Sequence, residues 1–220
     1  SQTEENYLKA IFKVCEKTGK SASTNAISKE MSTSAASVTD MLNRLSRKDL
    51  IHYKPYKGVT LTEEGKKIST TLIRKHRLWE VFLYDKLEFA WDEVHEMAEQ
   101  LEHIHSPELV DRLDAFLGHP RFDPHGDPIP DADGNFADRH QIALAELLPG
   151  QKGVVVGVQE HSSKFLQYLT QLDVGLGSEM EMLEIFEYDG SVKVRLAGRN
   201  EQILTKKVCQ HLLVQKKLNS

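Results

Sequence analysis

The stretch "TSAASVTDMLNRLSRKDLIHYKPYKGVTLTEEG", residues 33–65, decides the fold of the first third of the chain. Its first half places apolar side chains along one helical face, at Ala35, Val38, Leu42 and Leu45. Two short β-prone runs then flank the turn residues Pro55 and Gly58, which predicts a β-hairpin. Thr62, followed by two glutamates, predicts the start of a long helix. The stretch therefore predicts a helix, a hairpin wing and a second, longer helix.

Two further helices are predicted ahead of this stretch. "TEENYLKAIFKVCEKTG" is expected to form a helix with Thr3 as its N-cap and Gly19 at its end, and "STNAISKEMS" a short second helix. A short helix joined by a tight turn to one that begins with small polar residues is typical of a helix-turn-helix. In the winged helix-turn-helix predicted here, the side chains expected to reach bases or phosphates are Ser34, Ser37, Thr39, Arg44, Arg47, Lys54 and Lys57. The alternative is a small helical domain with an ordinary basic surface.

The charge is unevenly distributed along the chain. Residues 1–76 contain 14 Lys and Arg against 8 Asp and Glu, whereas residues 77–220 contain 14 against 25. A basic head on an acidic body indicates that the head binds a polyanion. The only two cysteines, Cys15 and Cys209, lie far apart in the sequence and indicate no disulfide framework. We therefore expect the protein to work in a reducing cytoplasm. Since no apolar run is long enough for a membrane span and no signal peptide is evident, we predict no membrane association.

The stretch "VHEMAEQLEHIHSPE", residues 94–108, predicts a helix with Asp92 as its cap. Four of its polar side chains fall within an arc of about 100°: His95, Glu99, Glu102 and His103. A core-facing arc of that width is normally apolar. The preceding long helix carries a pair of its own, since His76 and Glu80 are four residues apart. An imidazole and a carboxylate at that spacing can share one divalent ion.

Other interpretations of these polar helices explain less. A zinc-protease helix needs a second histidine where the chain has Glu99, and the inverted protease motif fails at the same position. A solvated charged face explains Glu96 and Gln100, but it does not explain why two successive helices carry histidine–glutamate pairs. The pattern therefore favours a metal site.

The segments "RKHRLWE" and "VHEMAEQLEHIHSPELVDRL" resemble the metal-dependent repressors of the diphtheria-toxin-repressor and manganese-transport-regulator family, and the similarity covers essentially the whole chain. The resemblance implies two metal sites between a DNA-binding head and dimerisation helices. The implied ancillary ligands are His76, Glu80 and His95. The implied primary, regulatory ligands are Glu99, Glu102, His103 and Asn6.

Longer members of that family add two primary ligands from a loop, and "GHPRFDPHGDPIP" places Asp123 and His125 at the corresponding positions. Similar proteins often have cysteine where Asp123 stands. Carboxylate oxygen in place of sulfur makes the site harder and favours Mn²⁺, with Fe²⁺ as the alternative. Asn6 offers only a neutral amide oxygen, so Glu4, Glu5 or a water molecule is an alternative ligand there.

The last third of the chain is predicted to form a β domain. After a Pro-, Gly- and Asp-rich loop at residues 118–145, β-prone runs alternate with turns around the short helix "SSKFLQYLTQLDV", which predicts a small barrel of about five strands. The pieces "LLPGQKG" and "LGSEMEML" resemble the SH3-like, FeoA-type domain of the longer family members. That resemblance implies His161 as a further ancillary ligand, and the alternative is a polar residue that caps the short helix.

We therefore predict a multidomain, mainly α chain with a winged helix-turn-helix (residues 1–73), a helical dimerisation and metal-binding domain (74–140) and a small SH3-like β-barrel (141–220). The amphipathic segment "SPELVDRLDAFLG" is expected to bury a dimer interface. The resemblance implies a non-enzymatic repressor of metal-homeostasis genes that binds palindromic double-stranded DNA as a homodimer and takes no small-molecule substrate. A metallohydrolase and a metal-independent winged-helix regulator are the alternatives.

Overall fold

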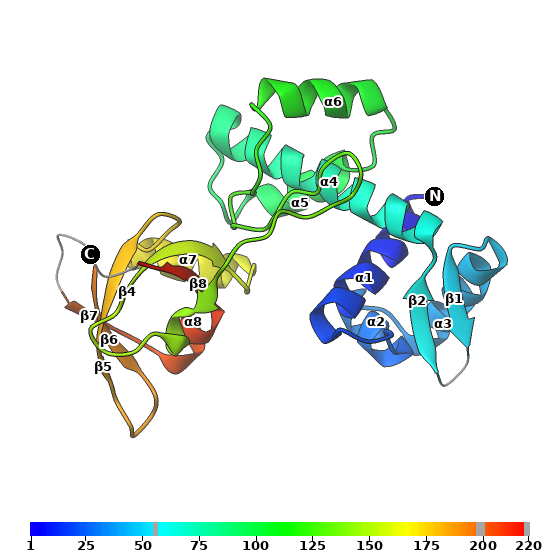
Figure 1. Ribbon diagram of the computed structural model, residues 1–220. Coiled ribbons are helices and arrows are strands. Elements are labelled where there is room, and N and C mark those ends of the chain that lie inside the picture. Colours follow the sequence, from blue (N-terminus) through cyan, green and yellow to red (C-terminus); the bar gives the residue numbers. More distant parts are fainter. Residues whose placement is uncertain (55–56, 197–200, 218–220) are drawn as a thin grey trace.

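The computed structural model describes residues 1–54, 57–196 and 201–217, which form a helical head, a helical middle and a C-terminal sheet (Figure 1). The head has the predicted order of three helices and a hairpin. Its elements are α1 (Gln2–Thr18), α2 (Thr24–Glu30), α3 (Ala35–Arg47), β1 (Ile51–Lys54) and β2 (Gly58–Leu61). The strands pair antiparallel from Ile51 opposite Leu61 to Lys54 opposite Gly58. Pro55, predicted for the turn of the wing, lies outside the described residues.

The head has its own apolar core, to which α1, α2, α3 and the hairpin all contribute. Val38, Leu42 and Leu45 of α3 are fully buried in it as predicted, but Ala35 is exposed. The N-cap of α1 is Ser1, which forms a capping box with Glu4, so the assignment of Thr3 as the cap was wrong. Two acidic side chains in the first turn favour this earlier start, because they lie near the positive end of the helix dipole.

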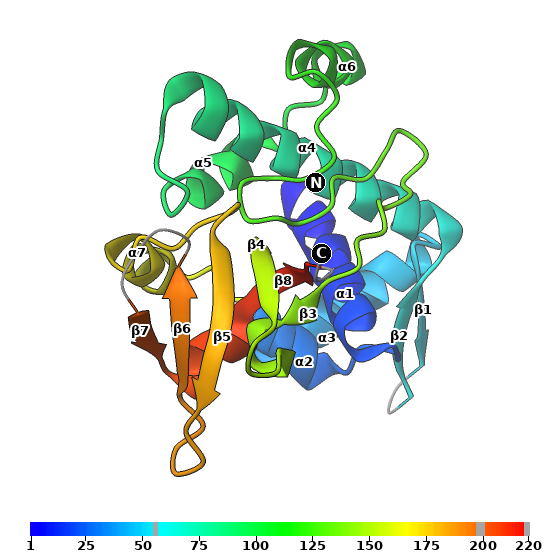
Figure 2. The ribbon, with the colours of Figure 1, turned by 60° about the vertical axis from the view of Figure 1, so that its left-hand side comes forward.

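The middle consists of α4 (Glu63–Leu87), α5 (Val94–Leu101) and α6 (Pro107–Phe116). Thr62 caps α4 as predicted, since its side chain accepts a hydrogen bond from the backbone N–H of Gly65. Both views place α6 on the outer side of α4, away from the C-terminal sheet (Figures 1 and 2). The α4 helix contacts the head through α1 and the middle through α5 and α6, so side chains of α4 can face either part.

The predicted cap of α5 was wrong. Glu93 is the N-cap and makes no side-chain cap hydrogen bond. Asp92 turns instead to the C-terminal domain, where its carboxylate accepts a hydrogen bond from Gln167 Nε2 at 2.7 Å. The neighbouring Trp91 is buried in the apolar core of that domain, and its indole N–H donates to Thr170 Oγ1 at 3.0 Å. The α4–α5 connection thus ties the middle to the C-terminal domain.

The C-terminal domain is an antiparallel sheet with strand order β3-β8-β4-β5-β6-β7. Its elements are β3 (Ile142–Ala143), a 3₁₀ turn (Leu144–Glu146), β4 (Lys152–Val158), α7 (Ser163–Gln171), β5 (Glu179–Ile185), β6 (Val192–Leu196), β7 (Glu201–Leu204), α8 (Lys206–His211) and β8 (Leu212–Lys216). Within the described residues β3 and β7 are the ends of a six-stranded sheet, so the predicted five-stranded barrel is corrected to an open sheet. A mainly α chain was also too simple a description, because this whole third is built on strands.

The loop between α6 and β3 lies against the sheet at Gly126. This residue has φ +86°, and a Cβ there would fall 2.1 Å from the backbone oxygen of Val156 and 2.4 Å from Gly157 Cα. Only glycine permits this approach, which brings the neighbouring Asp123 and His125 toward the α4–α5 side of the molecule. Among the helices described by the structure, none is both long and apolar enough to span a bilayer.

Candidate metal centre and DNA-binding surface

Glu80 of α4 lies at the centre of a buried group of histidines. Its Oε1 lies 3.0 Å from His76 Nε2 and 3.2 Å from His95 Nδ1, and the two imidazole nitrogens are 3.2 Å apart. His76 precedes Glu80 by one helical turn, and His95 comes from the first turn of α5, as the spacing predicts. These three residues can supply two nitrogen ligands and one oxygen ligand to a single ion.

The other oxygen of Glu80 faces the loop. Oε2 lies 3.6 Å from His125 Nδ1, which is itself 4.0 Å from Asp123 Oδ1. Glu80, Asp123 and His125 form a second possible ligand group, and all three are buried. Glu80 is therefore common to both groups, and we call the five residues His76, Glu80, His95, Asp123 and His125 the Glu80 cluster.

Two hydrogen bonds orient the imidazoles of His76 and His125 toward Glu80. His76 Nδ1 donates to Glu102 Oε2 at 2.6 Å, and this contact turns its Nε2 toward Glu80, 3.0 Å away. His125 Nε2 donates to the backbone carbonyl of Trp91 at 2.7 Å, and this contact turns its Nδ1 toward Glu80. Carboxylates and carbonyls orient metal-bound histidines in this way. The nitrogen and oxygen donors, with no thiolate among them, fit Mn²⁺ or Fe²⁺.

The protonation states of the cluster are strongly shifted. Burial raises the pKa of Glu80, but hydrogen bonds from His125, His76 and His95 outweigh burial and hold that pKa well below its usual range. Burial lowers the pKa of His125, yet its contact with Glu80 raises the net pKa to about 9. Burial and the nearby Glu80 charge raise the pKa of Asp123 to about 7. Without an ion, protons provide much of the positive charge that Glu80 needs, and metal binding has to displace them.

The structure groups the loop residues differently from the prediction. Asp123 and His125 were expected beside Glu99, Glu102 and His103, but they face Glu80 because the loop is held against β4. Arg77 Nε also lies 3.5 Å from Asp123 Oδ2.

His161 stands just before α7 and adjoins this side of the cluster. Its ring centroid is 5.1 Å from that of His125, while its Nε2 donates to the carbonyl of Val158 at 3.2 Å. His161, predicted as a ligand together with His76, Glu80 and His95, therefore lies next to His125 in the structure.

A second polar group lies between α1 and α5. Lys9 Nζ lies 2.6 Å from Glu102 Oε1 and 2.8 Å from Oε2, and it also lies 3.5 Å from Glu99 Oε1. His103 Nε2 is 3.7 Å from Glu102 Oε1. Asn6 lies on the same part of α1, and its Oδ1 is buried with no hydrogen-bond partner in the described structure. We call Asn6, Lys9, Glu99, Glu102 and His103 the α1–α5 cluster.

Sequence reasoning missed Lys9 and left the role of Glu5 open. The carboxylate of Glu5 accepts a hydrogen bond from His103 Nδ1 at 2.6 Å, and Asn6 lines the same hollow as Glu99 and His103. The signal for Lys9 was present, because it follows Asn6 by three residues and therefore shares its helical face. A charged lysine is not a metal ligand, so a search for ligand patterns does not select it.

The predicted DNA-binding side chains all lie on the head and are exposed or half-exposed. Ser34 is the N-cap of α3, and its hydroxyl accepts from the backbone N–H of Ser37, so part of its role is structural. Thr39 donates its hydroxyl to the carbonyl of Ala35. Lys54 ends β1 and Lys57 precedes β2, which places both lysines at the tip of the hairpin.

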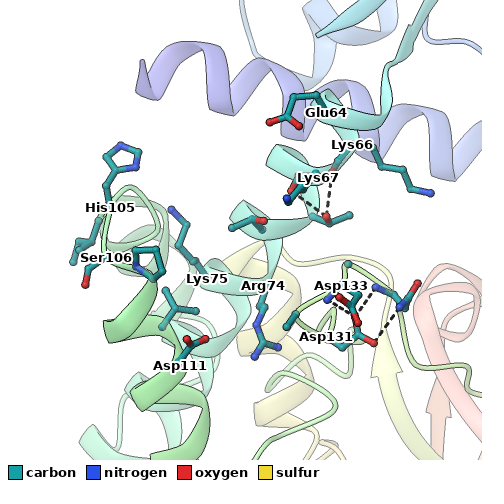
Figure 3. A pocket seen from close by; sticks show the side chains of 18 of the residues that line it. Glu64, Lys66, Lys67, Arg74, Lys75, His105, Ser106, Asp111, Asp131 and Asp133 are labelled. Atoms are coloured by element: carbon teal, nitrogen blue, oxygen red, sulfur yellow. Dashed lines mark hydrogen bonds between the residues drawn. The ribbon is translucent and has the colours of Figure 1, made fainter.

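A pocket of about 880 Å³ lies between α4, the start of α6 and the loop at residues 131–135 (Figure 3). Its walls carry both charges, because Lys66, Lys67 and Arg74 line it together with Asp111 and Asp131 (Figure 3). The described lining includes no predicted metal ligand. This hollow is therefore separate from both clusters, and the chemistry described above does not depend on it.

Comparison with known proteins gives matches along the whole chain. The family descriptions that match are "Iron dependent repressor, N-terminal DNA binding domain" (residues 1–59), "Iron dependent repressor, metal binding and dimerisation domain" (62–131) and "FeoA domain" (142–216). The iron-dependent repressor IdeR of Mycobacterium tuberculosis is 28% identical, with 97% of each chain covered. The diphtheria toxin repressor of Corynebacterium diphtheriae is 27% identical over 92% of each chain. A solved manganese-dependent transcriptional repressor in complex with manganese is 32% identical, with a TM-score of 0.85 over 97% of this chain and 100% of that one.

Proposed function

Because the chain belongs to the family of iron-dependent repressors, we propose that it represses transcription as a dimer whose binding to operator DNA depends on Mn²⁺, with Fe²⁺ as the alternative ion. The observation that carries the metal requirement is the position of Glu80. One buried carboxylate faces imidazoles from α4 and α5 with one oxygen and the loop with the other. Buried charges persist in proteins when they are paired or bound to metal.

We assign the Glu80 cluster as the principal metal centre, with His161 as an additional ligand beside His125. The assignment is supported by the orienting hydrogen bonds from His76 to Glu102 and from His125 to the carbonyl of Trp91. Asn6, Glu99, Glu102 and His103 remain proposed ligands of a second ion between α1 and α5. The preference for Mn²⁺ rests on the carboxylate of Asp123, which is a harder ligand than a thiolate.

The proposed domain division remains residues 1–73, 74–140 and 141–220. The DNA-contacting residues proposed on the head are Ser34, Ser37, Thr39, Arg44, Arg47, Lys54 and Lys57. In the middle domain Phe116 of α6 is 65% exposed and Leu109 is 37% exposed, which supports a proposed dimer contact on this helix. Two heads held by one dimer would read the two halves of a palindromic operator.

The proposed coupling acts through the position of α1. This helix packs on α4 and reaches the end of α5 through Lys9 and Glu5, so the metal-binding helices support the head directly. A divalent ion would supply positive charge that holds α4, α5 and the loop together. If that arrangement fixes the two recognition helices at the spacing of the operator, metal and DNA each increase the affinity for the other, by about 5–150-fold for a typical coupling.

The test is an electrophoretic mobility shift assay with a palindromic duplex selected from random sequence in the presence of Mn²⁺. We expect a dissociation constant at least tenfold lower with Mn²⁺ than with EDTA. A Glu80→Gln variant should lose most of the difference, whereas Glu96→Gln, on the exposed side of α5, should retain it. Equal DNA affinity in Mn²⁺ and EDTA would favour the metal-independent regulator. Membership of a family of repressors, which is not an enzyme family, excludes the metallohydrolase alternative.

A further inference from the structure

The α1–α5 cluster already contains a cation that belongs to the chain. The ammonium of Lys9 contacts both oxygens of Glu102, and the side chains of these residues are 8% and 1% exposed. The same ammonium lies 3.5 Å from Glu99 Oε1. Lys9 thus occupies the position between Glu99 and Glu102 that a metal ion bound to both carboxylates would take.

The remaining groups around Glu102 leave little negative charge for an ion. Glu102 Oε2 also accepts the hydrogen bond of His76, so both of its oxygens have donors. Lys75 of α4 lies within electrostatic range of Glu5 and Glu102 and provides a second ammonium. Its side chain also lines the pocket of Figure 3, on the side that carries His105. Glu102 therefore has the ammonium of Lys9 in direct contact and a second lysine within electrostatic range.

The Glu80 cluster is different in this respect. Among the contacts described for Glu80 the partners are the imidazoles of His76, His95 and His125 and no lysine, while Arg77 Nε lies 3.5 Å from Asp123 Oδ2. The ammonium of Lys9 is part of a side chain of α1, so it cannot dissociate from the protein as a free cation would. Like charges repel strongly when they are partly removed from water, so an ion beside Lys9 is disfavoured.

We propose that Lys9 is the resident cation of the α1–α5 cluster, where it holds α1 against α5 without metal and makes Mn²⁺ binding there much weaker than at the Glu80 cluster. Lys9 is thus a residue that determines which of the two clusters responds to metal. This inference rests on the proposed metal-dependent function, but it concerns Mn²⁺ affinity and can be measured without DNA.

The experiment measures Mn²⁺ binding by competition with a fluorescent chelator, in full-length protein that carries Glu80→Gln to weaken the Glu80 cluster. Adding Lys9→Met to this background should lower the dissociation constant for Mn²⁺ at least tenfold. Lys9→Arg, which keeps the charge, should leave the dissociation constant within a few-fold of the parent. Lys17→Met, a matched loss of charge at an exposed position on the same helix, should leave it unchanged.

Thermal unfolding gives a second readout. Lys9→Met leaves the buried Glu102 without its main partner, so in EDTA its melting temperature should fall, and Mn²⁺ should raise it more than it raises that of the parent. If Lys9→Met does not fold, Lys9→Gln replaces it, because glutamine is neutral and can still donate to Glu102.

The possible failures are distinguishable. Tight Mn²⁺ binding in Glu80→Gln that neither Lys9→Met nor Lys9→Gln improves would overturn the role of Lys9 and leave the proposed repressor function intact. Wild-type protein that binds Mn²⁺ at neither cluster would overturn both. Tighter binding in Lys9→Met together with metal-independent DNA binding in the wild type would support the role of Lys9 and end the proposed function.

Discussion

His76 and Glu102 join the two clusters, because His76 Nδ1 on α4 donates to Glu102 Oε2 at 2.6 Å. The opposite ring nitrogen of His76 faces Glu80, and the opposite oxygen of Glu102 accepts from Lys9. The orientation of a metal ligand proposed for one cluster is therefore set by a residue of the other. A change in either cluster is expected to alter the other.

The first prediction follows from this link. Glu102→Gln should weaken Mn²⁺ binding at the Glu80 cluster by about 10-fold or more, because loss of an orienting carboxylate typically costs 10–100-fold in metal affinity. The measurement is a titration with Mn²⁺ against a competing chelator, with Glu96→Gln as a control on the same helix. The link would be disproved if both variants bound Mn²⁺ as the wild type does.

The wing lysines give a prediction about salt dependence. Lys54 and Lys57 are exposed at the tip of the β1–β2 hairpin, and a lysine that binds phosphate releases counterions from DNA. Lys54→Gln and Lys57→Gln should each weaken binding to every duplex to a similar degree and reduce the slope of log K against log salt by about 1. Fluorescence anisotropy at several salt concentrations measures the slope. Lys29→Gln on α2 is the control, and a slope unchanged in the wing variants would place the hairpin away from the DNA.

The proposed dimer contact can be tested at Phe116. Its ring is 65% exposed at the end of α6, and burial of an aromatic side chain is a common source of interface free energy. Phe116→Asp should raise the dimer dissociation constant at least tenfold, or by about 1.4 kcal/mol. Sedimentation velocity over a range of protein concentrations measures the dimer dissociation constant. Tyr188→Asp changes an even more exposed aromatic residue on the C-terminal domain and should have no effect. If the dimers of both variants had the same dissociation constant, the dimer interface would not lie at Phe116.

Local pattern was sufficient to predict the head and the long helix. The apolar spacing of α3 and the Thr62 cap depend on residues within a few positions of one another, and the structure confirms both. Asp92 shows where such reasoning ends. Asp92 has the position and chemistry of a helix cap, but its carboxylate accepts a hydrogen bond from Gln167, which is 75 residues away. Local propensity cannot anticipate a tertiary partner at that distance.

The candidate metal centre was predictable in part for the same reason. His76, Glu80 and His95 follow from spacing along two helices. Asp123 and His125 were predicted with Glu99, Glu102 and His103 but lie beside Glu80, because their position depends on the packing of Gly126 against β4, which no short-range pattern encodes. Lys9 was missed because its partner Glu102 is 93 residues away, and because a cation is not expected among metal ligands.

The last prediction concerns the pH dependence of stability and the ion pair between α1 and α3. Lys48 Nζ lies 2.7 Å from Glu4 Oε1, and this hydrogen bond is the largest cause that lowers the pKa of Glu4 from 4.5 to about 2. Since the folded pKa is depressed, the stabilisation is complete above the unfolded value of 4.5 and is lost as the pH falls toward 2. The side chain of Lys48 is 52% exposed, so solvent screening limits the contribution to about 1 kcal/mol.

Lys48→Met should therefore lower the free energy of unfolding in urea by about 1 kcal/mol at pH 7. The difference from the wild type should shrink steadily below pH 4.5, because protonated Glu4 no longer needs its partner. Arg47→Met, the adjacent residue at the end of α3, is the matched control and should show no such pH dependence. A difference that stayed constant between pH 7 and pH 3 would mean that Lys48 stabilises the head through contacts of its aliphatic chain rather than through the charge of Glu4.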